Sequence, residues 1–278
     1  MIDLCVMTSV CPDMTVDQTI GAMKKHGYKS LEPRVEWEHR QGIELTMSAR
    51  QRTELKARFK DEGLVIACVA TGVGMGVVDS AARDEQIRLL HDYIDLAGDL
   101  GCRYVRTFGR EVLEGVEMKA VVDYVAAGYR QVTDHAADRD VIVLMETHDR
   151  WCNSSHVAAV VEQVRHPNMG VLWDFMHPQR FCEKVEYTFG HIGHLTRHIH
   201  AHDARYVENN RRTEICDLGE GVFDHATPLG LLERAGFEGF FSVEVIHNPG
   251  SDHDAKAVMA QYAQAFAEIM SHVRGTSG

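Results

Sequence analysis

Short apolar and β-branched runs alternate with longer segments of helical periodicity along the whole chain. Runs of about four to eight such residues are typical of strands buried on both faces. The strands are expected at Ile2–Met7, Tyr28–Arg34, Leu64–Thr71, Tyr104–Phe108, Val141–Thr147, Met169–Trp173, Thr196–His202 and Phe240–Ile246. The helices are expected at Val16–His26, Ser48–Glu62, Ala82–Leu100, Lys119–Arg139, Ser154–Val164, Leu229–Ala235 and Asp254–Val273.

This alternation of strands and helices predicts parallel strands joined by crossover helices. Gly27, Gly63, Gly101 and Gly236 follow expected helices, where a left-handed residue commonly ends the helix. The segment Met7–Pro12 lacks the glycine-rich loop that follows the first strand of an open dinucleotide-binding sheet. We therefore expect one α/β domain over residues 1–278, a single (β/α)₈ TIM barrel with a metal site at its C-terminal face.

Successive strands in the second half of the chain each end in a residue type that binds metal ions: Glu146, Asp174, a histidine of the triplet His198–x–His200–x–His202, and Glu244. The carboxyl ends of barrel strands meet at one mouth, so these side chains should lie together. A buried carboxylate needs a partner, which is either a cation or a neighbouring Arg or Lys. Three carboxylates and one imidazole favour one divalent cation, Mn²⁺ or Mg²⁺, with Co²⁺ or Zn²⁺ as alternatives.

Several of these segments, taken together, resemble the xylose-isomerase-like sugar phosphate isomerase/epimerase superfamily over essentially the whole chain. They are Met145–His148, Gly170–His177, His198–Asp203, Leu218–Gly221 and Ser242–Val245. The resemblance implies that Glu146, Asp174, His200 and Glu244 hold the metal ion. It also implies that His177 contacts substrate, that His202 stands where many relatives have Lys, and that Glu220 lies near the mouth.

The resemblance implies a reaction that begins with removal of a proton next to the carbonyl of a keto-sugar or a polyol-derived substrate. In that hypothesis Glu146 and Glu244 remove and return the proton, and His177 stabilises the developing oxyanion. The outcome is isomerisation or epimerisation.

Two departures from the ketose 3-epimerases leave an alternative open. Those enzymes carry a second Glu six residues after the first metal-binding Glu, where this chain has Cys152, and a Pro directly after that first Glu, where it has Thr147. The Glu-x-His arrangement of Glu146 and His148 is similar to dehydratase and lyase members, such as inosose or dehydroshikimate dehydratases and C-glycoside deglycosidases. His148 is then either the base of a lyase or a residue that orients a ligand carboxylate. A non-catalytic carbohydrate-binding subunit is a third interpretation.

Further candidates for substrate contact are Trp37, Arg110 and Arg180. Trp151 is expected either in the core or, with Trp37, in an apolar wall for a sugar ring. For Arg106, Arg211 and Arg212, exposure at the surface is favoured over a role in binding.

The net charge of −12 argues against nucleic acid as a partner, because that binding depends on clustered Lys and Arg. No run approaches the roughly 20 apolar residues of a membrane helix, so no membrane association is expected. Seven scattered cysteines and the absence of a visible leader favour a cytoplasmic protein. We expect a small, neutral or weakly acidic sugar-like substrate rather than a doubly charged phosphate, and a homodimer.

Overall fold

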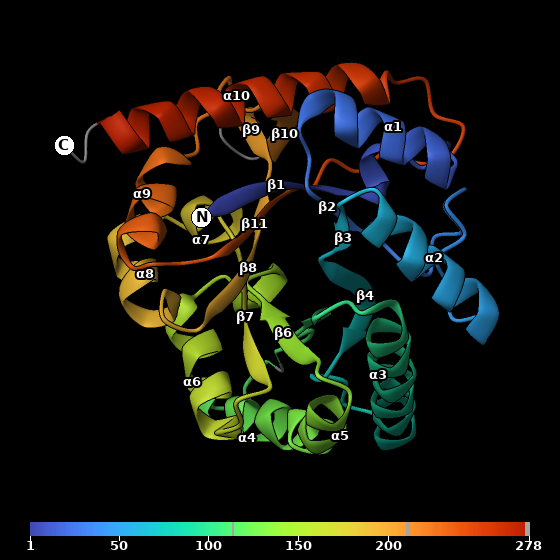
Figure 1. Ribbon diagram of the computed structural model, residues 1–278. Helices are drawn as coiled ribbons and strands as arrows, with labels where there is room; N and C mark the ends of the chain where they lie inside the picture. Colours follow the sequence, from blue (N-terminus) through green and yellow to red (C-terminus); the bar gives the residue numbers. More distant parts are fainter. Residues whose placement is uncertain (113, 210–211, 276–278) are drawn as a thin grey trace.

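The computed structural model describes residues 1–112, 114–209 and 212–275. Its strands form a parallel sheet that curls into a barrel, with helices around the outside (Figure 1). The sheet has the order β3-β2-β1-β11-β8-β7-β6-β5-β4, and a bridge between Arg34 and Ala70 joins its two ends. The strands are β1 (Ile2–Met7), β2 (Ser30–Glu32), β3 (Val65–Ile66), β4 (Cys68–Gly74), β5 (Tyr104–Phe108), β6 (Ile142–Glu146), β7 (Met169–Asp174), β8 (Thr196–Ala201) and β11 (Gly239–Val243).

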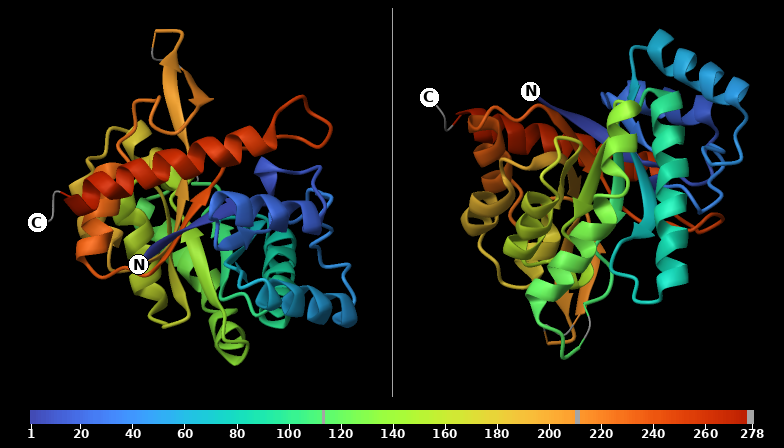
Figure 2. Two further views of the ribbon diagram at one scale, coloured as in Figure 1. Left: turned by 45° about the horizontal axis from the view of Figure 1, so that its top comes forward. Right: turned by 90° about the horizontal axis from the view of Figure 1, so that it is seen from below.

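The helices cover the outer face of the barrel on all sides in Figures 1 and 2. They are α1 (Val16–His26), α2 (Ala49–Asp61), α3 (Ser80–Leu100), α4 (Met118–Tyr129), α5 (Thr133–Asp138), α6 (Ser154–Val164), α7 (Met176–Arg180), α8 (Val185–Ile192), α9 (Ala226–Arg234) and α10 (Ala255–Gly275). Short 3₁₀ turns follow β1 and β6, at Thr8–Val10 and Asp149–Trp151. No helix in the described part of the chain is both long and apolar enough to span a bilayer.

The inside of the barrel changes from apolar to polar along the strands. Ile142 and Leu144 share one side of β6 with Glu146, because side chains alternate along a strand. Both belong to a small buried cluster with Leu172, and the ring of Tyr104 packs against it. Ionisable side chains gather at the carboxyl ends of the strands, so the apolar layer closes the floor beneath the site.

The predicted barrel is confirmed, and the errors lie in particular elements. The segment Lys119–Arg139 is two helices, α4 and α5, instead of one. Val125, Tyr129, Val132 and Ala136 are all buried, so the apolar repeat runs through the break and hides it. The helices α7 and α8 were not predicted, and α7 carries Pro178 in its short span, a residue that ordinarily argues against a helix.

The long loop expected after β8 contains an antiparallel hairpin, β9 (Asp203–Val207) and β10 (Arg212–Cys216), which projects from the barrel (Figure 2). The buried carboxylate of Asp203 anchors the base of this hairpin. It accepts hydrogen bonds from the amides of Ala204 at 2.9 Å, of Gly219 and Gly221 at 3.0 Å each, and of Phe223 at 3.4 Å. A Cβ on Gly221 would lie 1.9 Å from an Asp203 oxygen, so only glycine fits there.

Replacing Asp203 with Asn should therefore lower the free energy of unfolding by roughly 1.5–3 kcal/mol, since an amide nitrogen would face backbone N–H donors. Urea unfolding followed by tryptophan fluorescence measures this change. Glu214→Gln, at an exposed position of β10, is the matched control. Equal midpoints for the two variants would show that the carboxylate does not stabilise the turn.

Candidate metal centre and adjoining pocket

Four buried side chains from neighbouring strands meet at the carboxyl end of the barrel. Glu146 and Asp174 are the last residues of β6 and β7, His200 lies near the end of β8, and Glu244 directly follows β11. The sheet register sets His200 opposite Asp174 on one side and Ser242 on the other. The expected gathering of four ligand-type residues is therefore present in the structure.

Their candidate ligand atoms all lie within 4.8 Å of one another. The Nδ1 atom of His200 is 3.0 Å from Glu146 Oε1 and 3.0 Å from Glu244 Oε2. Within the described residues, Glu146 Oε2, Asp174 Oδ2 and Glu244 Oε2 are buried and make no hydrogen bond, although a basic nitrogen lies 3.0–3.2 Å from each. Burying unsatisfied carboxylate oxygens is costly unless a cation binds them. Three oxygen donors and one imidazole nitrogen fit a divalent cation.

A further carboxylate, Glu32, holds the opposite edge of the His200 ring. Glu32 is the last residue of β2 and is fully buried, with Oε1 2.9 Å from His200 Nε2. Its other oxygen is 2.8 Å from His198 Nε2 and accepts a 2.5 Å hydrogen bond from the Ser242 hydroxyl. Such an outer carboxylate fixes the orientation of a metal-binding imidazole. Glu32 was missed in the sequence, although it carries the same signal of a carboxylate at a strand end.

In this cluster, buried carboxylates and histidines stabilise each other's charged forms. Burial opposes ionisation of Glu32, but the charges of His200 and His198 hold its pKa below the usual range. Burial likewise opposes protonation of His200, yet Glu32, Glu244 and Glu146 raise its pKa well above the ordinary value. Acidic groups therefore flank both ring nitrogens, with Glu146 and Glu244 at Nδ1 and Glu32 at Nε2.

Arg106 lies in the same buried layer, which corrects the expectation that it is exposed. Its side chain is 2% exposed, with Nη1 3.2 Å from Glu146 Oε2. Its guanidinium also lies 4.2 Å from the centre of the Phe108 ring. The strand β5 points this side chain into the barrel, so Arg106 is a partner of the buried Glu146 carboxylate. This agrees with the alternative in which a neighbouring Arg or Lys, rather than a cation, compensates such a carboxylate. The remaining ligand oxygens have no such arginine in the described structure.

A second group joins Asp174 to His177 and His202. His202 Nε2 is 3.1 Å from Asp174 Oδ2, and His177 Nε2 is 3.7 Å from the same oxygen. Burial lowers the pKa of His177 to about 4, so its ring is neutral near pH 7. For His202 burial is outweighed by Asp174, and the pKa rises to about 9, so this ring is protonated near pH 7. A protonated His202 places positive charge where many relatives have Lys.

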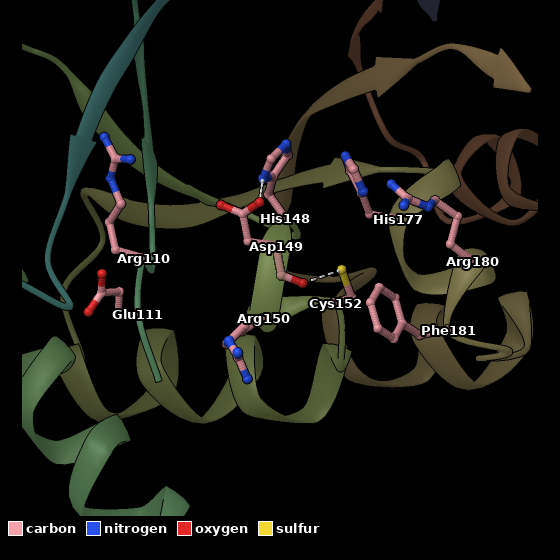
Figure 3. Close-up of a pocket in the computed structure, with 9 residues that line it drawn as sticks. All are labelled: Arg110, Glu111, His148, Asp149, Arg150, Cys152, His177, Arg180 and Phe181. Atoms are coloured by element: carbon pink, nitrogen blue, oxygen red, sulfur yellow. Dashed lines mark hydrogen bonds and ion pairs between the residues drawn. The ribbon is translucent and has the colours of Figure 1, made fainter. Parts of the chain in front are cut away.

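A pocket of about 650 Å³ opens beside the metal cluster (Figure 3). His148 and His177 form the wall next to the cluster, with ring centres 4.3 Å apart. Burial tends to lower the pKa of His148, but the adjacent Asp149 carboxylate, 2.9 Å away, and Glu146 raise it overall. The rest of the lining is Arg110, Glu111, Asp149, Arg150, Cys152, Arg180 and Phe181.

The remaining candidates lie away from the cluster or are covered. Glu220 is exposed and pairs with Arg205 at 2.5 Å. Trp37 is partly buried beneath the Arg34 guanidinium, 4.3 Å from its ring centre. Trp151 is fully buried in the core and donates to the Arg110 carbonyl oxygen. Arg212 is exposed as expected and pairs with Glu208, and Arg211 lies outside the described residues. Substrate contact by Glu220 and Trp37 stays a prediction.

The architecture and the strand-end donors define a metal-binding type of TIM barrel, and comparison with known families agrees. The model of the xylose isomerase-like TIM barrel family matches residues 20–268. The chain belongs to this family. Comparison with curated protein sequences gives no match.

Solved structures with the same fold share little sequence with this chain. The IOLI protein with a bound zinc atom superposes with a TM-score of 0.83 at 17% identity, covering 98% of this chain and 99% of that protein. L-ribulose 3-epimerase superposes with a TM-score of 0.81 at 16% identity, covering 100% of this chain and 97% of that protein. The probable 3-DHS dehydratase AsbF from Bacillus anthracis superposes with a TM-score of 0.77 at 18% identity, covering 96% of this chain and 99% of that protein. At such identities the likeness establishes the fold and leaves the reaction open.

Replacing Glu244 with Gln should weaken Mn²⁺ binding by more than about 100-fold, because a charged ligand matters more than the outer residues whose loss typically costs 10–100-fold. Isothermal titration and the thermal stabilisation given by Mn²⁺ measure the loss. The control is Glu186→Gln on the exposed side of α8. Wild-type affinity in Glu244→Gln would remove Glu244 from the ligand set.

Replacing Glu32 with Gln should weaken metal binding about 10–100-fold, since His200 loses the charge that orients and polarises its ring. The visible absorption spectrum of the Co²⁺-loaded variant should also change, because the His200 nitrogen donor is altered. Ser242→Ala removes one hydrogen bond to Glu32 and leaves the Glu32–His200 contact, so it should have the smaller effect. An unchanged spectrum and affinity in Glu32→Gln would mean that the β8 backbone alone orients His200.

Proposed function

We propose that this protein is a divalent-metal-dependent isomerase or epimerase that removes a proton next to the carbonyl of a keto-sugar or polyol-derived substrate. The observation that carries this proposal is the pair of carboxylates on either side of His200 Nδ1. Glu146 and Glu244 each have a buried oxygen without a hydrogen-bond partner in the described chain, beside a pocket of sugar-like size. Two such groups can remove a proton from one face of a carbon and return it on the other.

A divalent cation in the site would polarise the substrate carbonyl and lower the barrier to an enediolate. The protein groups then have separate tasks. The neutral His177 ring, with Nε2 unpartnered and next to the pocket, can donate a hydrogen bond to the developing oxyanion. Protonated His202 adds positive charge behind Asp174. Arg106 offsets the charge of Glu146 from below.

The second candidate is a dehydratase or lyase that begins with the same proton removal. Its support is His148, which faces the pocket next to His177 and has its pKa raised by Asp149 despite burial. Such a ring can exchange a proton with substrate near neutral pH. Cys152 stands in the position of the epimerases' second Glu, and its thiol donates a hydrogen bond to the Asp149 carbonyl oxygen. Burial and Asp174 raise its pKa to about 12, so it cannot replace that Glu as a base.

Turnover in deuterium oxide tests the proton-removal step. Mn²⁺-loaded protein is incubated with ketoses, inososes and 3-keto-glycosides, and the products are read by mass spectrometry and NMR. We expect one solvent deuteron at the carbon next to the carbonyl and a product otherwise equal in mass to the substrate. Loss of water or of an aglycone would favour the lyase, and no exchange with any member of the panel would contradict both.

Replacing His148 with Ala separates the two candidates. If Glu146 and Glu244 transfer the proton, the variant should keep metal and deuterium exchange within about tenfold of wild type, since loss of an acid–base group typically costs 100-fold or more. His194→Ala, an exposed histidine before β8, is the control for removal of a ring. Loss of turnover by more than about 100-fold with metal retained would assign the base role to His148.

A further inference from the structure

Two exposed arginines of the pocket, Arg180 and Arg150, have no hydrogen bond or ion pair in the described chain, and Arg180 is the one directed at His177 (Figure 3). Arg180 ends the short helix α7 and lines the pocket together with His177. No hydrogen bond or ion pair within the described parts of the chain occupies its side chain. In Figure 3 its nitrogens point toward His177 and the centre of the pocket. A free guanidinium beside an unpartnered imidazole nitrogen is an arrangement that favours an anionic ligand group.

The other two arginines of the pocket are placed differently. The Arg110 side chain donates to the Gly72 carbonyl oxygen, and its guanidinium lies 5.6 Å from the Phe108 ring centre. Arg150 is exposed like Arg180, but in Figure 3 its guanidinium points away from His148 and His177. Arg180 is therefore the arginine that a ligand next to the metal cluster would meet.

The spacing along the chain gives the distance that a ligand must bridge. Asp174, His177 and Arg180 follow one another at intervals of three residues. His177 and Arg180 lie three apart on α7 and so share a face, with Cβ atoms about 5–6 Å apart. A molecule that binds at the cluster and passes His177 would reach Arg180 with its far end.

Charge balance supports an anionic end on that molecule. The ligand carboxylates Glu146, Asp174 and Glu244 are offset by a divalent cation and by Arg106, so the loaded cluster is close to neutral. The pocket beyond it contains three arginines against two acidic residues, Glu111 and Asp149, and Asp149 already contacts His148. The open end of the site is therefore net positive although the chain as a whole is acidic.

We propose that the substrate is a hydroxylated carboxylic acid whose carboxylate pairs with Arg180 at the end remote from the reacting carbonyl. This inference rests on the proposed function for the location of the carbonyl. A planar guanidinium matches a carboxylate through two parallel hydrogen bonds. A phosphate dianion would be repelled by Glu111 and Asp149 more strongly than a carboxylate, and only Arg180 among the three pocket arginines is directed at His177. The sequence led us to expect a neutral or weakly acidic sugar-like substrate, and this proposal selects the acidic one.

Binding to the Mn²⁺-loaded protein, measured by isothermal titration, tests the inference without requiring turnover. The probes are two matched pairs, D-glucuronate with D-glucose and quinate with its methyl ester, and glucose 6-phosphate is added as a separate arm. We expect each acid to bind about tenfold or more tighter than its neutral counterpart. Arg180→Gln should abolish that preference, Arg180→Lys should restore part of it, and Arg150→Gln should retain it. Manganese affinity should be unchanged in all three variants.

The inference is overturned if neither acid binds more tightly than its neutral partner, or if Arg180→Gln keeps the preference. Tighter binding of glucose 6-phosphate than of glucuronate would overturn the assignment to a carboxylate. The outcome is separable from that of the proposed function, because a carboxylate preference can persist when no probe exchanges a proton. If deuterium exchanges only into neutral sugars and acids bind no more tightly, the proposed function stands. The pairing of a substrate carboxylate with Arg180 is then rejected.

Discussion

Negative charge buried at the carboxyl end of the barrel is the constraint on which the rest of the structure depends. Glu32, Glu146 and Asp174 are completely buried, and Glu244 is 7% exposed. Isolated carboxylates in such surroundings would cost far more free energy than a folded domain has to spare. Arg106, His198, His200, His202 and Ser242 lie in contact with these carboxylates and compensate them. Three of the carboxylate oxygens contact a basic side chain without a hydrogen bond to it, and they converge where a cation fits.

Strand β8 distributes most of this compensation. His198 and His200 on β8 and His202 just after it point to the same side because the side-chain period of a strand is two. Each imidazole meets a different carboxylate environment: His198 contacts Glu32, His200 lies between Glu32 and the pair Glu146 and Glu244, and His202 contacts Asp174. The triplet is therefore used in full, although only one member is a candidate ligand in the four-residue cluster. One strand and the residue that follows it thus bring a histidine to each of these buried carboxylates.

The sequence predicted the barrel and the four ligand-type residues because both depend on local patterns. Strand–helix alternation predicts parallel pairing, and parallel pairing brings strand ends to one mouth. Contacts between distant segments were harder to foresee. Glu32 on β2 meets His200 on β8 across the barrel interior, and Arg106 meets Glu146 from the adjacent strand β5, contacts that the order of residues does not reveal. The hairpin β9–β10 was missed for a related reason, since it depends on the Asp203 carboxylate collecting amides up to twenty residues away.

The metal cluster alone does not select a reaction, because removal of a proton next to a carbonyl begins isomerisation, epimerisation and elimination alike. The selection must lie with groups that the substrate meets beyond the cluster. In this chain these groups belong to the segments after β6 and β7, where His148, Cys152, His177 and Arg180 line one pocket. The substitution of Cys152 for a Glu removes one carboxylate from that wall, and His148 brings in a ring with a raised pKa. Both changes make the wall less acidic. A less acidic wall suits the carboxylic acid that we propose as substrate, whereas the choice between the proposed isomerase or epimerase and the lyase depends on whether His148 exchanges a proton.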